Sequence, residues 1–181
     1  PKFLIELFKQ ESPEVANGVV EIKAIAREPG ARSKVAVYTQ DESIDPIGSC
    51  VGQRGSRVNT ITTELNGEKI DLIEWSSTPE QFVADALSPA EIESIELNEE
   101  EKKATVYVSE SEQSLAIGKG GQNVRLAAKL TGWKIDIVSI DAEEPTQGPT
   151  EEAADVIAGE EEAIKDEIVE VVNESETKEL E

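Results

Sequence analysis

One structural unit occurs twice in this chain, and this repeat constrains the fold more than any other feature of the sequence. Residues 51–58 (VGQRGSRV) and 117–124 (IGKGGQNV) align at an offset of 66 residues, with both glycines and both flanking apolar residues in register. The match continues at an offset of 65 over residues 65–72 and 130–137. Similarity at a fixed spacing indicates that one supersecondary unit has been duplicated. Two related domains are therefore expected.

The charge of the chain separates a tail from the repeats. The net charge is −22, and residues 141–181 hold 16 acidic and 2 basic residues, so the tail alone contributes −14. Such a composition predicts an acidic, mostly disordered tail. Residues 160–173 carry apolar side chains at near-helical spacing and could form an amphipathic helix. The expected division is a first domain at 1–76, a second at 77–140 and the tail.

Each repeat predicts the order α-β-β-α-α-β. Apolar spacing, β-rich runs and Gly or Pro stops define the elements. In the first copy we expect them at 2–10, 19–27, 34–39, before Gly52, 56–65 and 69–75; in the second at 79–87, 91–97, 104–109, before Gly118, 122–130 and 134–140. The predicted fold class is α+β, with a three-stranded sheet in each domain.

A Gly-x-x-Gly loop lies between two predicted helices in each repeat. Glycine allows close approach of a ligand to the backbone, and the following helix offers unpaired N–H groups and the positive end of its dipole. Such a loop favours a phosphate, and the loops and adjacent side chains supply further donors. The candidate contacts are Gly52, Gln53, Arg54, Gly55, Arg57, Gly118, Lys119, Gly120, Gly121, Gln122 and Arg125. Apolar residues of the helices and of the last strand are expected to wall a cleft for unstacked bases beside each loop.

A tight turn without a ligand is the alternative interpretation of these loops. One Gly-x-x-Gly match is expected by chance, whereas two at equivalent positions of a repeat are far more specific. Acidic residues are absent from 46–63 and from 113–135, although the chain as a whole is acidic. An acid-free surface around each loop is what binding to a polyanion requires.

Several functional classes are excluded by composition. The chain has no His and a single Cys, so histidine-based catalysis, histidine metal ligation and an internal disulfide are impossible. We find no catalytic constellation, and we expect no enzyme activity, no metal and no cofactor. No apolar run reaches the roughly 20 residues of a membrane span, which argues against a membrane partner. A single Cys fits a reducing compartment, and we expect a cytoplasmic protein.

Four strings carry a resemblance to a known family. Residues 26–37 (AREPGARSKVAV), 52–58 (GQRGSRV), 67–71 (GEKID) and 115–127 (LAIGKGGQNVRLA) are similar to the tandem KH domains, of prokaryotic type II, in the NusA family of bacterial transcription factors. The resemblance covers about residues 1–140. It implies binding of single-stranded RNA and a role in transcriptional pausing, termination and antitermination.

The resemblance also implies contacts and partners. The glycine loops would contact RNA, and the basic hairpin of Arg27, Arg32 and Lys34 belongs to the family pattern. The implied partners are the nascent transcript, RNA polymerase and other elongation factors, and we expect a monomer. The polymerase-binding and OB-fold domains that usually precede the KH pair are absent from this sequence, which favours a C-terminal part of a longer protein.

Two alternatives remain open from the sequence. A protein-interaction adaptor, whose KH units and acidic tail dock protein partners without RNA, competes with the RNA-binding interpretation. The tail could be a solvated spacer or an RNA mimic that folds back on the basic loops.

Overall fold

The computed structural model describes residues 1–140, which belong to a single compact unit. The first repeat contains α1 (Lys2–Glu11), α2 (Pro13–Ala16), β1 (Glu21–Glu28), β2 (Arg32–Tyr38), α3 (Pro46–Val51), the 3₁₀ turn η1 (Gln53–Gly55), α4 (Ser56–Glu64) and β3 (Lys69–Glu74). The second contains α5 (Pro79–Ala86), β4 (Ser94–Asn98), β5 (Lys103–Ser109), α6 (Glu110–Ile117), η2 (Lys119–Gly121), α7 (Gln122–Thr131) and β6 (Lys134–Ile140). The predictions for the tail, including the helix at 160–173, lie outside the described residues.

Both repeats contain the expected α-β-β-α-α-β order, so the predicted α+β class is confirmed. The short helix α2, which follows α1 after a single residue, is not among the predicted elements. Pro13 occupies its first turn, where its missing N–H costs nothing, and the Ser12 hydroxyl accepts a hydrogen bond from the Val15 N–H at 3.4 Å. Strand β4 begins at Ser94, three residues later than the predicted start at Glu91.

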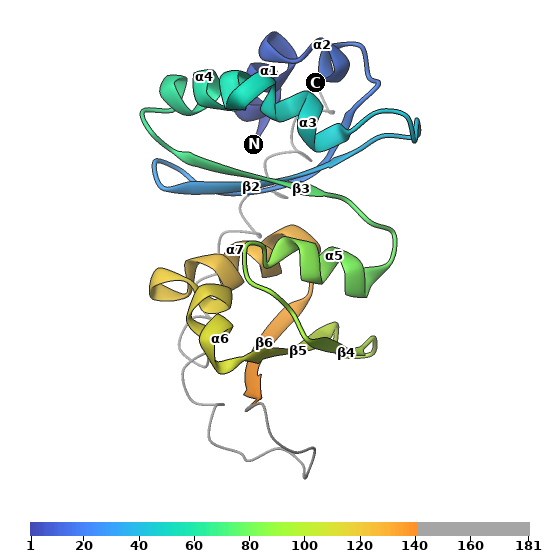
Figure 1. Cartoon of the computed structure of the whole chain (residues 1–181), viewed down its shortest axis with the longest axis vertical. Helices are drawn as coiled ribbons and strands as arrows, with labels where there is room; N and C mark the ends of the chain where they lie inside the picture. Colours follow the sequence, from blue (N-terminus) through green and yellow to red (C-terminus); the bar gives the residue numbers. More distant parts are fainter. Residues whose placement is uncertain (141–181) are drawn as a thin grey trace, which may run out of the picture. The chain divides into compact units, whose positions relative to one another are not determined.

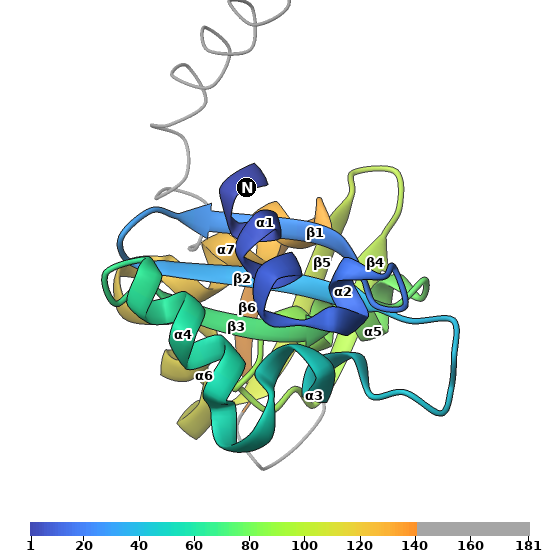
Figure 2. The same ribbon diagram turned by 90° about the horizontal axis from the view of Figure 1, so that it is seen from above.

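The two three-stranded sheets have the same topology. In the first, β1 pairs antiparallel with β2, and β2 pairs parallel with β3. In the second, β4 pairs antiparallel with β5, and β5 parallel with β6. Helices α1 to α4 lie over one face of the first sheet, and α5 and α7 of the second repeat lie against its other face (Figure 1). The view from above shows α1 to α4 spread across β1, β2 and β3 (Figure 2).

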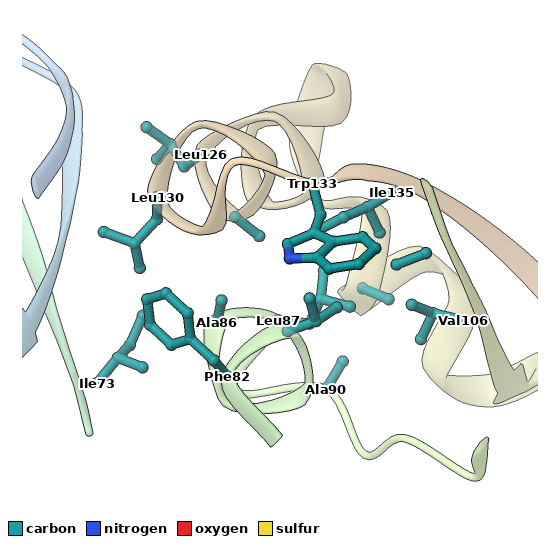
Figure 3. Close-up of a cluster of buried hydrophobic side chains, with 14 of the residues drawn as sticks. Ile73, Phe82, Ala86, Leu87, Ala90, Val106, Leu126, Leu130, Trp133 and Ile135 are labelled. Carbon is teal, nitrogen blue, oxygen red and sulfur yellow. The ribbon is translucent and has the colours of Figure 1, made fainter. Parts of the chain in front are cut away.

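The second repeat shares its hydrophobic core with the first. Ala26, Ala36 and Ile73 of the first sheet belong to the same buried cluster as the apolar side chains of α5 and α7. Ile73 points toward Phe82 and Leu130 (Figure 3). A separate cluster beneath α1, α3 and α4 includes the fully buried Leu4, Phe8 and Ile61. Because the larger cluster crosses the boundary between the repeats, burial of apolar surface holds them together.

No helix within residues 1–140 is long and apolar enough to cross a lipid bilayer.

Candidate nucleic-acid interface

The two glycine loops have the same backbone conformation. Gly52 and Gly118 have φ, ψ of 74°, 175° and 76°, 171°, a region that is essentially restricted to glycine. Arg54 and Gly120 are both left-handed, at 54°, 31° and 60°, 29°. In each loop the N–H of the last glycine donates to the carbonyl of the first at 3.1 Å. The sequence repeat is therefore also a repeat of detailed geometry.

The first glycine of each loop allows close contact with the helix that follows. A Cβ on Gly52 would lie 2.7 Å from Cγ of Arg57, and a Cβ on Gly118 would lie 2.8 Å from both the backbone nitrogen and Cβ of Asn123. A Cβ on Gly120, in contrast, would meet no atom within 4 Å. The loop tip is open, whereas its entry is closed to any side chain.

Each loop leads into a helix that no side chain caps. Within residues 1–140, neither Gly55 nor Gly121, the residues before α4 and α7, contributes a capping side chain. The first N–H of each helix, that of Ser56 or Gln122, donates to the carbonyl of Gln53 or Lys119. The N–H groups that follow it receive no acceptor from the cap residue, and these are the groups that a helix N-terminus offers to an anion. The adjacent cations Arg54 and Lys119 are exposed and have no ion-pair partner in the described part of the chain.

The surface has a hollow beside the first loop and another that this loop does not line. One hollow of about 640 Å³ adjoins the loop, and Glu14, Asp45, Ser49 and Arg57 give it polar walls. A smaller hollow of about 270 Å³ is lined by residues of α3, β3 and α5. The sequence predicts a cleft beside each loop with apolar walls from the helices and the last strand. The smaller hollow is not that cleft, because the loop does not line it, the second repeat contributes one side, and most of its lining residues are polar.

Two residues after each loop, different side chains make equivalent hydrogen bonds. The offset of 66 pairs Arg57 with Asn123, and the structure confirms this equivalence. Nη1 of Arg57 donates to the Ser49 carbonyl, and Nδ2 of Asn123 donates at 3.4 Å to the carbonyl of Leu115, the equivalent of Ser49. Each side chain thus links the helix after the loop (α4 or α7) to the helix before it (α3 or α6). The sequence predicts an RNA contact from both Arg57 and Arg125, but the two positions are not equivalent, because the offset of 66 pairs Arg125 with Asn59.

Two of the predicted basic contacts are held by carboxylates from elsewhere in the fold. Arg57 donates to Glu14 at 2.8 Å. Nε of Arg125 donates to Glu28 at 2.7 Å, and Nε2 of Gln122 donates to the other oxygen of Glu28 at 2.7 Å. The hydrogen bonds from Arg125 and Gln122 outweigh the effect of burial and lower the pKa of Glu28.

The basic hairpin is also committed to ion pairs. Arg27 donates to both oxygens of Glu68 at 2.8 and 2.9 Å. Arg32 likewise holds Asp71 with two hydrogen bonds, at 2.6 and 3.0 Å. The equivalent strand positions of the second repeat form the ion pair Lys103–Asp136, at 2.8 Å.

Lys34 is fully buried in the described conformation. Its ammonium donates to the Ser88 carbonyl at 3.0 Å and lies 3.6 Å from Asp71. Burial lowers its pKa, and the Asp71 carboxylate partly offsets this. The predicted residues of each glycine loop therefore lie together in one turn. Lys34 lies away from them and links the two repeats through its hydrogen bond to Ser88.

Glu14 and Glu28 are not among the site residues that the sequence predicts. Both lie outside the acid-free windows, at 43 and 97 residues from Arg57 and Arg125. No local signal marks them, because their partners are set by how the hairpin and helices pack. Cys50 is buried, which raises the pKa of its thiol to about 12 and keeps it protonated.

Two α-β-β-α-α-β units, each with a glycine loop leading into an uncapped helix, define a pair of KH domains of the prokaryotic type. The NusA-like first KH domain matches residues 1–75, and the NusA-like second KH domain matches residues 79–145. The chain belongs to the NusA family, of which it carries the tandem KH region.

Curated relatives agree with this assignment, and a solved structure is similar in fold. The transcription termination/antitermination protein NusA of Bacillus subtilis is 58% identical over 139 residues, which are 77% of this chain and 38% of that protein. NusA of Thermus thermophilus is 58% identical over 134 residues, 74% of this chain and 35% of that protein. The crystal structure of APE1850 superposes with a TM-score of 0.56 and 29% identity, covering 75% of this chain and 95% of that one. The chain thus spans between a third and two fifths of the length of these NusA relatives.

Proposed function

We propose that this chain is the RNA-binding part of a transcription termination/antitermination factor. Each glycine loop clamps the backbone of single-stranded RNA, the nascent transcript, and the tandem arrangement adds avidity. RNA polymerase and other elongation factors are the partners that membership of the NusA family suggests. The chain itself acts by binding and not by catalysis.

The observation that carries this proposal is the repeated loop geometry. Two loops with the same rare backbone angles each lead into a helix of nine or ten residues whose N-cap is a glycine. The exposed residues between the outer glycines are Gln53 and Arg54 in the first loop, and Lys119 and Gly120 in the second. Helix N-termini bind phosphate through backbone N–H groups, and this contact does not depend on the base sequence of the RNA. Arg54 of the first loop and Lys119 of the second add charge without a competing carboxylate within residues 1–140.

Charge reversal at the loop tips tests the proposal. The pair Gln53→Asp and Arg54→Asp, and the pair Lys119→Asp and Gly120→Asp, place carboxylates where the phosphate would lie. We expect each pair to weaken binding of a labelled single-stranded RNA by at least about tenfold at low salt, and both pairs together to abolish it. Fluorescence anisotropy measures the affinity, and circular dichroism checks that each variant is folded.

Lys102→Asp provides a matched control. Like Arg54, Lys102 is an exposed basic residue with a left-handed backbone, at φ 52°, but it lies in the turn before β5, next to the C-terminal end of α7. A ten-residue helix separates its two ends by about 15 Å, so Lys102 is remote from the second loop. Lys102→Asp should leave RNA affinity within about twofold of wild type. Equal affinities for the wild type and both loop variants would favour the protein-adaptor alternative.

A further inference from the structure

A carboxylate of the first repeat lies against the phosphate loop of the second. Glu28 ends β1, and its two oxygens accept hydrogen bonds from Arg125 and Gln122 of α7, both at 2.7 Å. Contacts between α7 and the first sheet bring these residues together (Figure 1). The side chain of Glu28 is 23% exposed and that of Arg125 is 45% exposed, so solvent reaches this ion pair.

The same guanidinium touches the loop itself. Nη1 of Arg125 donates to the carbonyl of Gly120 at 3.1 Å, and Gln122 is the first residue of α7. A phosphate bound by the loop and the N-terminus of α7 would therefore lie beside the two side chains that now hold Glu28. The carboxylate and a phosphate are both anions that accept from Arg and Gln donors, so they can exchange.

Among the described residues, the first loop has no equivalent arrangement. Asn59 occupies the position of Arg125, and its amide nitrogen lies 3.2 Å from where a Cβ on Gly55 would be. An amide there carries no charge for a carboxylate to neutralise. Within residues 1–140, the second repeat combines a cation at this position with an anion delivered by the other repeat, and the first repeat does not.

We propose that Glu28 determines the RNA affinity of the second loop by competing with backbone phosphate for Arg125 and Gln122. The proposal rests on the proposed function, since it requires RNA at the second loop. RNA that engages these side chains must displace Glu28 and so breaks a contact between the repeats. The attraction of Arg125 for phosphate is reduced for as long as Glu28 is paired with it.

The test uses the full 181-residue chain with Gln53→Asp and Arg54→Asp, so that binding reports on the second loop. The probe is a fluorescein-labelled oligoadenylate of roughly 12 nucleotides, titrated between about 50 and 200 mM salt. Glu28→Gln keeps the shape of the side chain and one of its two acceptor oxygens but removes its charge. We expect it to tighten binding roughly three- to tenfold at low salt and to steepen the slope of log K against log salt by about 0.7.

A double-mutant cycle separates this effect from a structural one. Arg125→Gln should change affinity little while Glu28 is present, and should cancel the gain in the Glu28→Gln background. Glu21→Gln makes the same charge change at the far end of β1 and should leave affinity unchanged. Binding that Glu28→Gln weakens or leaves unaltered would overturn the proposal, whatever the change in thermal stability. If Lys119→Asp has no effect in the same background, the second loop is no RNA site, and it is the proposed function that fails there.

Discussion

Asn123 and Arg57 occupy equivalent positions after the two glycine loops, and each donates a hydrogen bond to the carbonyl one turn before the loop. Asn123 is 5% exposed, and besides Leu115 its amide reaches the carbonyls of Leu87 at 2.9 Å and Ala116 at 3.0 Å. Arg57 extends to the surface instead and pairs with Glu14. The second loop is therefore held by a buried amide, and the first by a guanidinium whose ion pair with Glu14 water can reach.

Asn123→Ala should destabilise the chain by about 2 kcal/mol, because buried carbonyl groups lose their donor. Urea unfolding followed by circular dichroism measures the free energy of unfolding. Arg57→Ala is the matched control, and we expect a loss of less than about 1 kcal/mol because its ion pair is partly exposed. Losses of the same size in both variants would contradict a special role for the buried amide.

Glycine is required at the entry of the second loop but not at its tip. Gly118→Ala places a Cβ 2.8 Å from the backbone of Asn123 at a glycine-only φ, ψ, and should cost about 2–4 kcal/mol. Gly120→Ala meets open space and pays only the left-handed penalty of about 1 kcal/mol. Gly52→Ala should fall between them, because it meets the Arg57 side chain, which can shift. Thermal and urea unfolding rank the three variants, and the reverse order would show that the loop is rebuilt.

Glu68 should make the stability of the chain depend on acid pH. Its side chain is fully buried, which raises its pKa, but hydrogen bonds from Arg27, Ser33 and the Gly30 N–H prevail and lower the pKa to about 2. Because the folded pKa lies below the unfolded value near 4.5, the stabilisation is complete above about pH 4.5 and is lost as the pH falls toward 2.

The contribution of Glu68 can be measured by comparing unfolding at two pH values. Glu68→Gln should lower the free energy of unfolding by up to about 3 kcal/mol at pH near 7, and the difference from wild type should shrink toward pH 2. Glu64→Gln, an exposed carboxylate at the end of α4, is the control and should have little effect at either pH. A difference that stays constant with pH would mean that packing, and not charge, is what Glu68→Gln removes.

Lys34→Met should affect stability and leave RNA binding unchanged. Methionine retains the apolar stem of the side chain but removes the ammonium that donates to Ser88. We expect the free energy of unfolding to fall by about 1–3 kcal/mol, because Asp71 and the Ser88 carbonyl lose a buried partner. RNA affinity and its salt dependence, measured by anisotropy on the folded variant, should match the wild type. A weaker, less salt-dependent affinity would show that Lys34 reaches RNA after all, as the family pattern implies.

Much of the fold follows from the sequence alone. The repeat, the element order and the two loops are encoded locally, by glycines that permit positive φ and by apolar spacing that matches a helix or a strand. The helix boundaries at α4 and α7 agree with prediction to within a residue or so. The short helix α2 was not predicted, because Ser12-Pro13 can both end one helix and begin the next.

The availability of each cation was decided only by the tertiary structure. The windows 46–63 and 113–135 contain no acid, yet the fold brings Glu14 to Arg57 and Glu28 to Arg125. Charge pairing depends on distance in space, and residues 43 or 97 positions apart become neighbours only when sheets and helices pack. The sequence by itself determined where the backbone can bind a phosphate. Packing within and between the two repeats determined which side chains remain available to contact that phosphate.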